Sequence, residues 1–360
     1  MGKRSGIGPW GTYDMAGNVA EWCWNGDKKG ARYILGGAWN TSSADYFEPG
    51  VGAPLSRIDG TGFRCVRNTA TLPPPATSPV ASSMRDLSKA QPASDEVFRI
   101  YRAMYAYDRT PLNAKVEPVK QDSADWRKEK ITVAAAYGNE RLALYLFVPA
   151  KIRPPYQTVV FFPSARVLDI ANSEKLGDMK FIDYVIRSGR VVMYPIYKGT
   201  YERPAQEAGL ATAAARETLI QQSKDLGRAL DYLETRPDID HDRFGYLGES
   251  MGAAQGVIFA AVDGRFKAVV FQDGGFFDER PLPGTDQVDF APRLTAPVLM
   301  VSGKYDWVLG GKDVMLRLFG TPAADKRAVT FDTPHDVSEQ RTDLIREVLT
   351  WLDKYLGEVN

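Results

Sequence analysis

The strongest constraint on the fold is an alternation of short apolar runs and longer helix-like segments between residues 158 and 357. Apolar runs of this length predict buried strands, and the segments between them have the apolar spacing of helices. Continuous apolar strands that alternate with helices are typical of a parallel sheet covered on both faces. The expected strands are 158–163, 190–197, 243–249, 266–275, 296–303 and 327–333, and the expected helices are 180–189, 213–236, 252–262, 312–320 and 341–357. The sequence therefore predicts an α/β fold, whose functional sites lie beyond the carboxyl ends of its strands.

A segment rich in Pro, Ser, Thr and Ala, residues 69–94, divides the chain. Three consecutive prolines, Pro73 to Pro75, favour a stiff extended spacer that cannot pack a core. We interpret this segment as a linker between a Gly- and Trp-rich head, residues 1–68, and a body, residues 95–360. The body is expected to open with a helix at 95–108 and then a hairpin within 129–149.

Composition excludes several functional classes. The chain has 360 residues and a formal net charge of zero, which removes the electrostatic argument for a nucleic-acid or acidic-membrane partner. No run approaches the ~20 apolar residues of a membrane span, and no apolar run follows the basic residues near the start as a secretory signal would require. Two cysteines, Cys23 and Cys65, permit one bridge but no disulfide framework. We expect reduced thiols and a cytoplasmic location.

A serine lies between an expected strand and an expected helix in "RFGYLGESMG". Gly248 and Gly252 flank Ser250 at two residues on either side, which is the pattern of a sharp strand-to-helix turn. Such a turn strains the serine backbone, projects its hydroxyl out of the sheet and directs the following N–H groups, beginning with Met251, at one point. The alternative is a serine that only caps the helix.

A serine hydroxyl needs a base, and the chain has only two histidines. His241 precedes the strand that leads to Ser250, so we expect it at the far end of that strand, in a surface turn. His335 follows the last expected strand in "VTFDTPHDVS" and therefore lies on the same edge as Ser250. It is the predicted base, against the alternative of an exposed loop residue.

A carboxylate must orient the base. Asp306 follows the penultimate strand in "VLMVSGKYDWVLG" and is the predicted third member, which gives the chain order Ser, Asp, His. Asp273 is a competitor that comes one strand earlier. Asp332 and Asp336 are competitors close to His335 in the sequence, which makes it hard for them to orient the ring.

The remaining site predictions concern two loops. The loop after strand 158–163 is expected to supply a second oxyanion donor, the N–H of Ser164 or of Ala165, with Arg166 near the mouth. An ordinary turn is the alternative. The segment between Tyr197 and Ala215 is expected to line the pocket or form a small lid. The candidate pocket aromatics are Tyr197, Tyr201 and Trp307, and ordinary packing explains each of them equally well.

Residues 125–358 resemble the α/β-hydrolase superfamily, especially its dienelactone hydrolase, acetyl-esterase and prolyl-oligopeptidase-like branches. The resemblance rests on "RPDIDHDRFGYLGESMG", "APVLMVSGKYDWV" and "TPHDVS", which match the family's nucleophile, acid and histidine loops in order and spacing. One departure is the oxyanion loop, which reads Phe-Pro-Ser-Ala where many members have a glycine-rich run. The resemblance implies an α/β-hydrolase fold and a mostly parallel central sheet.

The head resembles the carboxyl-terminal part of the formylglycine-generating, sulfatase-modifying enzyme domain, through "GTYDMAGNVAEWCWN", "RYILGGAWN" and "GFRCVR". The resemblance implies a loop-rich fold and places Asn18, Val19 and Glu21 near a position that holds calcium in relatives. The reactive cysteine pair that follows Gly-Gly-x-Trp in active members is missing, and Cys65 matches a non-catalytic position. We therefore expect a binding or structural role for the head, including docking on the body.

These observations predict a serine hydrolase that cleaves small carboxylic esters, with short acyl groups, through an acyl-enzyme and without a metal or organic cofactor. A peptidase or amidase is the alternative within enzymes, because prolyl-oligopeptidase relatives share the motifs. A non-catalytic binding module is the alternative outside them. An oxidase acting through the head would need copper and the missing cysteine pair. A homo-oligomer is left open.

Overall fold

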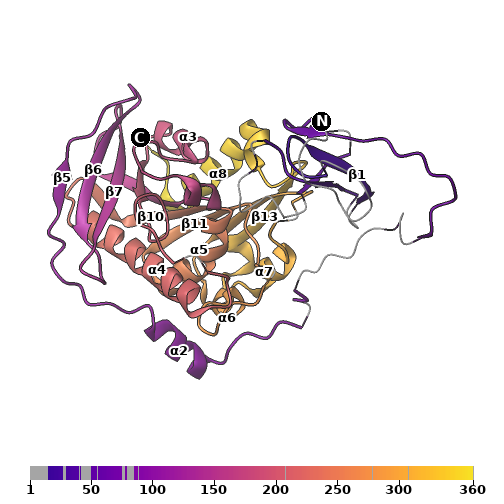
Figure 1. Cartoon of the computed structure of the whole chain (residues 1–360). Helices are drawn as coiled ribbons and strands as arrows, with labels where there is room; N and C mark the ends of the chain where they lie inside the picture. Colours follow the sequence, from indigo (N-terminus) through magenta and orange to yellow (C-terminus); the bar gives the residue numbers. More distant parts are fainter. Residues whose placement is uncertain are drawn as a thin grey trace. The chain divides into compact units, whose positions relative to one another are not determined.

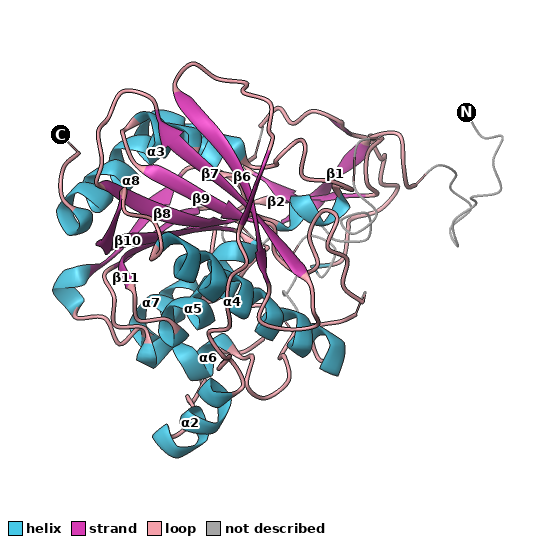
Figure 2. Cartoon of the chain, turned by 90° about the vertical axis from the view of Figure 1, so that its left-hand side faces the viewer, coloured by secondary structure: helices cyan, strands magenta, loops and turns pink. Residues whose placement is uncertain are grey.

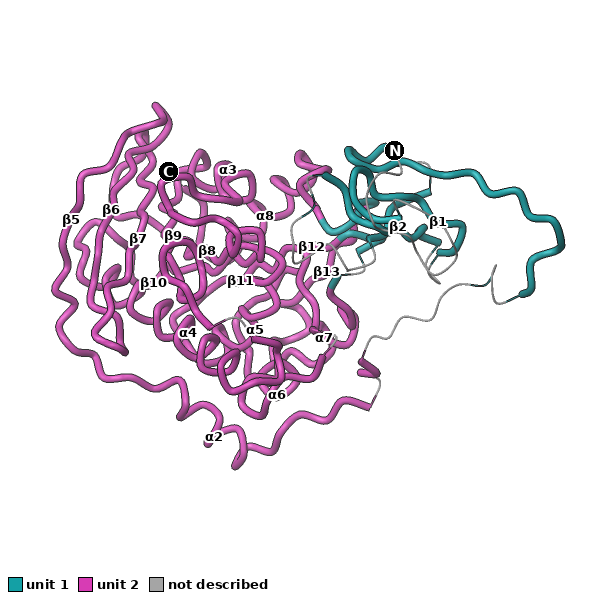
Figure 3. Tube along the Cα trace, in the orientation of Figure 1, with its two compact units in different colours: residues 1–83, 303–308, 332–335 teal, residues 84–302, 309–331, 336–360 magenta. Residues whose placement is uncertain are grey.

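The computed structural model describes residues 15–26, 30–39, 41, 50–54, 56–74, 78, 85–87, 89–206, 208–277, 279–306 and 308–359 (Figure 1). The chain divides into two compact units, which Figure 3 colours separately. The first unit contains residues 1–83, 303–308 and 332–335, and the second contains residues 84–302, 309–331 and 336–360. No helix among the described residues has the length and apolar character of a membrane span.

A nine-stranded sheet forms the centre of the second unit, in the order β13-β12-β11-β10-β8-β9-β7-β6-β5. The strands are β5 (Lys115–Glu117), β6 (Trp126–Ala134), β7 (Arg141–Pro149), β8 (Tyr156–Phe162), β9 (Val191–Pro195), β10 (Ile239–Glu249), β11 (Phe266–Gln272), β12 (Val298–Gly303) and β13 (Lys326–Phe331). The pairs β9–β8, β8–β10, β10–β11 and β11–β12 are parallel, whereas β5, β6 and β7 add antiparallel strands. The prediction of a mostly parallel central sheet is confirmed.

Helices cover both faces of this sheet (Figure 2). The helices of the second unit are α2 (Asp95–Ala103), α3 (Asp183–Arg187), α4 (Ala213–Leu233), α5 (Met251–Val262), α6 (Gln287–Phe290), α7 (Lys312–Leu318) and α8 (Arg341–Leu356), with short 3-10 turns η1 (Ala165–Asp169), η2 (Met179–Phe181), η3 (Ala291–Arg293), η4 (Ala323–Asp325) and η5 (Val337–Gln340). α4 and α5 pack on one face, and α3 and α8 pack on the other. Two apolar clusters result, one on each face.

Local sequence explains the element boundaries. Thr212 begins α4, because its hydroxyl accepts a hydrogen bond from the N–H of Ala215 at 3.2 Å. The hairpin between β6 and β7 turns at Gly138 and Asn139, which both have positive φ, as two-residue hairpin turns require. The expected helix 180–189 is instead η2 followed by α3, because Ile182 has a non-helical φ of −130°.

Two corrections concern segments near the predicted boundaries. β10 begins at Ile239, four residues earlier than expected, so His241 lies inside the strand rather than in a turn. Its side chain is exposed and its Nε2 lies 3.1 Å from the carbonyl oxygen of Arg236. The expected helix 95–108 ends at Ala103.

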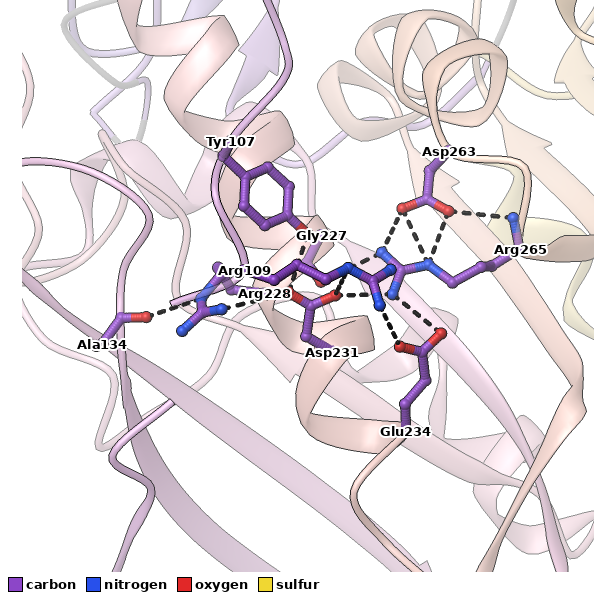
Figure 4. A network of polar contacts seen from close by, with 9 residues as sticks. All are labelled: Tyr107, Arg109, Ala134, Gly227, Arg228, Asp231, Glu234, Asp263 and Arg265. Atoms are coloured by element: carbon purple, nitrogen blue, oxygen red, sulfur yellow. Dashed lines mark hydrogen bonds and ion pairs between the residues drawn. The ribbon is translucent and has the colours of Figure 1, made fainter. Parts of the chain in front are cut away.

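A buried polar network fastens the segment after α2 to α4 and to the turn before β11 (Figure 4). Asp231, on α4, is its centre: it accepts a hydrogen bond from the hydroxyl of Tyr107 at 3.1 Å and pairs with Arg265 at 2.9 Å. Arg228 lies 3.4 Å from Asp231 and donates to the carbonyl of Ala134 at the end of β6. The network therefore connects α4 to three separate parts of the second unit.

The described part of the first unit contains a small four-stranded sheet in the order β3-β2-β1-β4. Its strands are β1 (Ala20–Gly26), β2 (Arg32–Leu35), β3 (Gly50–Gly52) and β4 (Thr61–Gly62). The strands are short and the described segments between them are loops and turns, as the resemblance implied. Cys23 and Cys65 are free thiols.

Candidate active site

Ser250 occupies the predicted turn between β10 and α5. Its backbone has φ 50° and ψ −107°, a strained conformation for a residue with a side chain, and its N–H donates to the carbonyl of Gln272 at 2.9 Å. A Cβ at Gly248 would overlap the backbone of Gly252, and a Cβ at Gly252 would overlap the backbone of Phe162. Both glycines are therefore required by the close packing of β10, α5 and β8 around this turn.

The Ser250 side chain makes no capping hydrogen bond to α5, so the interpretation of this serine as a simple helix cap is wrong. Met251 is the first residue of α5, whose first turn presents backbone N–H groups and the positive end of the helix dipole. A negative charge that develops beside Ser250 is therefore stabilised by this helix start.

His335 and Asp306 lie together in the first unit. Nδ1 of His335 is 2.9 Å from Oδ1 of Asp306, whose side chain is fully buried. The loops that carry them are joined by a hydrogen bond from the N–H of Tyr305 to the carbonyl of Thr333 at 3.1 Å. A Cβ at Gly303 would overlap the Pro334 backbone, so this glycine allows the two loops to approach. The carboxylate thus holds one ring nitrogen and sets the tautomer that leaves the other nitrogen as a base.

The three competing carboxylates have other partners. Asp273 is fully buried, has a φ of 49°, and accepts a hydrogen bond from the N–H of Val337 at 2.8 Å. Asp332 is mostly exposed and lies 3.8 Å from the Lys304 ammonium. Asp336 begins η5 and pairs with Lys180.

The oxyanion loop after β8 has one of its two candidate donors occupied. The N–H of Ser164 donates to Oδ2 of Asp178 at 2.7 Å, and the Ser164 hydroxyl accepts from the N–H of Arg166. Ser164 is therefore held by its own loop, and a hydrogen bond to substrate would have to displace the Asp178 contact. Ala165 is exposed at the start of η1 and becomes the preferred candidate.

The predicted pocket residues have different environments. Arg166 is half exposed and lies 3.7 Å from Asp336. Tyr197 is a core residue, with its ring stacked on Phe162 at 3.9 Å and its hydroxyl donating to the Phe161 carbonyl. Tyr201 is also buried: its hydroxyl accepts from the Gly177 N–H and lies 2.8 Å from the Tyr194 hydroxyl. The prediction that these two tyrosines line a pocket is wrong, because both pack inside. Trp307 lies outside the described residues.

Sequence reasoning missed the environment of Glu249, the residue before the nucleophile. Its side chain is 1% exposed, and its Oε2 has no hydrogen-bond partner among the described residues. Burial, reinforced by the nearby Asp273, raises the pKa of this carboxyl well above its usual range. No sequence signal distinguishes a buried residue from an exposed one at this position of the turn.

The residues expected near a calcium position in the head have partners within the first unit. The Glu21 carboxylate pairs with Arg64 at 2.6 Å. The Asn18 carbonyl accepts a hydrogen bond from the N–H of Trp39, and Val19 lies beside Gly62. The expected calcium position remains a prediction. The Arg64 guanidinium already pairs with the Glu21 carboxylate, whose negative charge a calcium ion would use.

Comparisons with protein families match both parts of the chain. Residues 142–318 match the dienelactone hydrolase family, and residues 4–69 match the sulfatase-modifying factor enzyme 1-like domain. Among curated proteins, none matches the chain.

Solved structures establish the fold. Acetyl xylan esterase 1 from Thermoanaerobacterium sp. JW/SL YS485 is 15% identical, with a TM-score of 0.58 over 73% of this chain and 94% of that one. The second unit has the α/β-hydrolase fold. An acetyl xylan esterase from Paenibacillus sp. R4 is similar at 16% identity and a TM-score of 0.56, over 74% of this chain and 96% of that chain. A putative dipeptidyl aminopeptidase IV from Bacteroides ovatus ATCC 8483 is similar at 17% identity and a TM-score of 0.53, over 64% of this chain and 36% of that chain. The second unit is called the hydrolase unit below.

The resemblances on which the sequence analysis relied are therefore confirmed for both parts of the chain.

Proposed function

We propose that the protein hydrolyses carboxylic esters of small molecules through Ser250, His335 and Asp306. The observation that carries this proposal is the strained backbone of Ser250 at the carboxyl end of β10, where the side chain has no capping role. Strain of this kind costs roughly 1–3 kcal/mol and persists where it serves a function. The dienelactone hydrolase match and the esterase folds support the same chemistry.

Strand order supports a meeting of the three side chains at one edge of the sheet. β10, β11, β12 and β13 are consecutive neighbours, and Ser250 directly follows the first of them. Asp306 follows β12 by three residues and His335 follows β13 by four. Loops that leave the carboxyl ends of neighbouring strands share an edge, which is where α/β sheets place their ligands.

In the proposed reaction the Ser250 hydroxyl attacks the ester carbonyl while His335 takes its proton. Asp306 stabilises the imidazolium that forms, and the N–H groups of Met251 and Ala165 bind the oxyanion. Collapse of the tetrahedral intermediate releases the alcohol, which receives the proton from His335. Water then attacks the acyl-enzyme by the same route, releases the acid and restores Ser250. These steps require no metal and no organic cofactor.

A second candidate is peptide or amide hydrolysis, which the similarity to the putative dipeptidyl aminopeptidase IV favours. This chain covers only 36% of that protein, so the similarity concerns the hydrolase unit alone. The acetyl xylan esterases are covered almost completely and favour esters with short acyl groups.

The test is hydrolysis of p-nitrophenyl acetate by the full chain and by Ser250→Ala. We expect kcat to fall at least about 10³-fold in the variant, because the nucleophile is lost while the fold is kept. Ser188→Ala is the matched control, since this serine follows α3, where its hydroxyl donates to the Val185 carbonyl and accepts from Arg190. Retention of most of the activity in Ser250→Ala would refute the proposal. Equal turnover of the matching anilide would favour the amidase.

A further inference from the structure

The loop after β8 lies next to the proposed nucleophile within the hydrolase unit. Phe162 of β8 pairs with Gly248 of β10, so Ser164 and Ser250 each lie two residues beyond this pair. A Cβ at Gly252 would overlap the Phe162 carbonyl, which shows how closely the end of β8 approaches the first turn of α5. The loop and the nucleophile therefore leave neighbouring strands at the same edge of the sheet.

The first turn of η1 has most of its polar groups satisfied by the loop itself. The Ser164 hydroxyl accepts a hydrogen bond from the Arg166 N–H at 3.2 Å, and the Ser164 carbonyl accepts one from Val167 at 3.4 Å. The Ser164 N–H donates to Oδ2 of Asp178 at 2.7 Å. Ala165 is exposed, and its N–H makes no hydrogen bond to another described residue, as is usual at the first position of a helix. This N–H is therefore left for a ligand.

Asp178 makes its contact with Ser164 from an unusual backbone conformation. Its φ is 58°, in the left-handed region that Asp enters more readily than most residues. Asp178 stands at the capping position of η2, yet its side chain makes no capping hydrogen bond there. The carboxylate instead reaches back across the loop to Ser164, and hydrogen bonds to a carboxylate are among the stronger ones in proteins.

The segment that carries Asp178 is itself fixed from two sides. The N–H of Gly177 donates to the hydroxyl of Tyr201 at 2.8 Å, and that hydroxyl lies 2.8 Å from the hydroxyl of Tyr194. On the other side, a Cβ at Gly177 would overlap the Val167 side chain of η1. Asp178 therefore has little freedom to move away from Ser164.

A second contact joins the loop after β8 to the loop after β9. The N–H and the hydroxyl of Ser173 donate to the two carboxylate oxygens of Glu202, at 2.8 and 2.7 Å. The Ser173 hydroxyl also lies 3.0 Å from the hydroxyl of Tyr145 on β7. The loop is thus held along its length before any substrate binds, which is the condition for effective stabilisation of an oxyanion.

We propose that Asp178 is a positioning residue of the oxyanion site. By holding the Ser164 N–H, it fixes the start of η1 so that the Ala165 N–H becomes the second oxyanion donor. Tyr201 supports this role by holding the backbone beside Asp178. The inference rests on the proposed function, since it concerns the same site.

The first test is hydrolysis of p-nitrophenyl acetate by Asp178→Gly. Glycine adopts a φ of 58° without strain, so the change removes the carboxylate and leaves the backbone free to keep its path. We expect kcat to fall about 10- to 100-fold, because one oxyanion donor contributes about 10²- to 10³-fold and small misplacements lose much of it. KM should change less than about twofold, since acylation and deacylation use the same donor.

Two further variants separate the hydrogen bond from other effects of the change. Asp178→Asn keeps an oxygen acceptor and should retain at least about one-third of the wild-type kcat. Asn139→Gly is the matched control, because Asn139 has a similar φ of 55° but is exposed in the turn between β6 and β7. It should leave kcat unchanged.

Inhibition by 1,1,1-trifluoroacetone distinguishes positioning from a loss of folded protein. The Ser250 oxygen adds to the ketone carbon, and the ketone oxygen then takes the place of the oxyanion. The inhibition constant does not depend on how much of the enzyme is folded. It should rise in Asp178→Gly by about the factor by which kcat falls. If Asp178→Gly does not fold, Tyr201→Phe replaces it and should change both quantities about threefold in the same directions.

The outcomes separate this inference from the proposed function. If Ser250→Ala retains its activity, the proposed function fails and the inference fails with it. The positioning role alone is overturned if activity depends on Ser250 but Asp178→Gly keeps kcat within twofold of the wild type. It is also overturned if Asp178→Asn loses as much activity as Asp178→Gly, or if kcat falls while the inhibition constant stays unchanged. An unchanged kcat in Tyr201→Phe overturns it where that variant is the test.

Discussion

At the scale of single residues, the most unusual neighbour of the proposed nucleophile is the Glu249 carboxyl. It is almost fully buried beneath the turn, and burial and Asp273 raise its pKa well above the ordinary value near 4.5. Burial and the neighbouring carboxylate thus favour the neutral form of this side chain, and the neutral form places no second negative charge next to Ser250. A neutral carboxyl is thus consistent with the electrostatics that the proposed reaction needs.

Glu249→Gln should change stability in a pH-dependent way. An acid whose pKa is higher in the folded state holds its proton there while the unfolded chain releases it above pH 4.5, so stability is lost as pH rises from that value toward the folded pKa. Glutamine has no proton to lose. The free energy of unfolding of the variant relative to the wild type should therefore increase between pH 5 and pH 8. The increase is about 1.4 kcal/mol for each pH unit of this range that lies below the folded pKa of Glu249.

Urea denaturation at pH 5 and pH 8 measures the free energy of unfolding of the variant and the wild type. Glu174→Gln is the control, because Glu174 is exposed and its replacement reports the effect of an amide at the surface. A difference between Glu249→Gln and the wild type that is constant from pH 5 to pH 8 would contradict the raised pKa.

The sequence predicted some site residues and not others for a physical reason. The strained turn at Ser250 follows from local chemistry, because glycines on both sides are what close packing at such a turn requires. The pairing of His335 with Asp306 followed from the order of strands. The hydrogen bond from the Ser164 N–H to Asp178 and the burial of Tyr197 depend on contacts between distant segments. The local sequence pattern does not encode such contacts.

At the scale of elements, α4 illustrates how a helix of the hydrolase unit is held. Its apolar side packs in the core, and its polar anchor is Asp231, which faces Tyr107, Arg109, Arg228 and Arg265 (Figure 4). Burial and the neighbouring carboxylate raise the pKa of Tyr107 to about 12, so its hydroxyl remains a donor at neutral pH.

Asp231→Asn should destabilise the protein by about 3–5 kcal/mol, because it leaves the buried Arg228 without its counter-charge, whereas Arg265 keeps its ion pairs with Asp263 and Glu234. Glu234→Gln is the matched control on the same helix. Glu234 is one-third exposed and pairs with Arg109 and Arg265, so its loss should cost at most about 1 kcal/mol. Chemical denaturation of the two variants measures both values, and equal small losses would contradict a central role for Asp231.

Most elements of the hydrolase unit were predictable because their apolar runs are long and continuous. Every expected strand from 158–163 to 327–333 has an observed counterpart, with ends that differ by a few residues. The prediction was weaker where tertiary packing decides the conformation, as at Ile182, where the expected helix is interrupted. The linker also differs from expectation, since Arg85 and Ala93 bind the hydrolase unit.

At the scale of the whole molecule, the chain combines two parts that match different family models. The proposed chemistry belongs to the hydrolase fold together with the loops after β12 and β13. Those loops, residues 303–308 and 332–335, group with the first unit in the division of the chain. The sequence order Ser, Asp, His spans 85 residues of chain, and only the parallel order of the strands makes a common site expected.

Covalent labelling by a fluorophosphonate tests the central claim most directly, because this probe reacts with a serine only when a base has activated it. Peptide mass spectrometry of the labelled full chain should locate the probe on Ser250, and His335→Ala should slow labelling by at least about 10³-fold. Labelling at a different residue, or an undiminished rate in His335→Ala, would contradict the account.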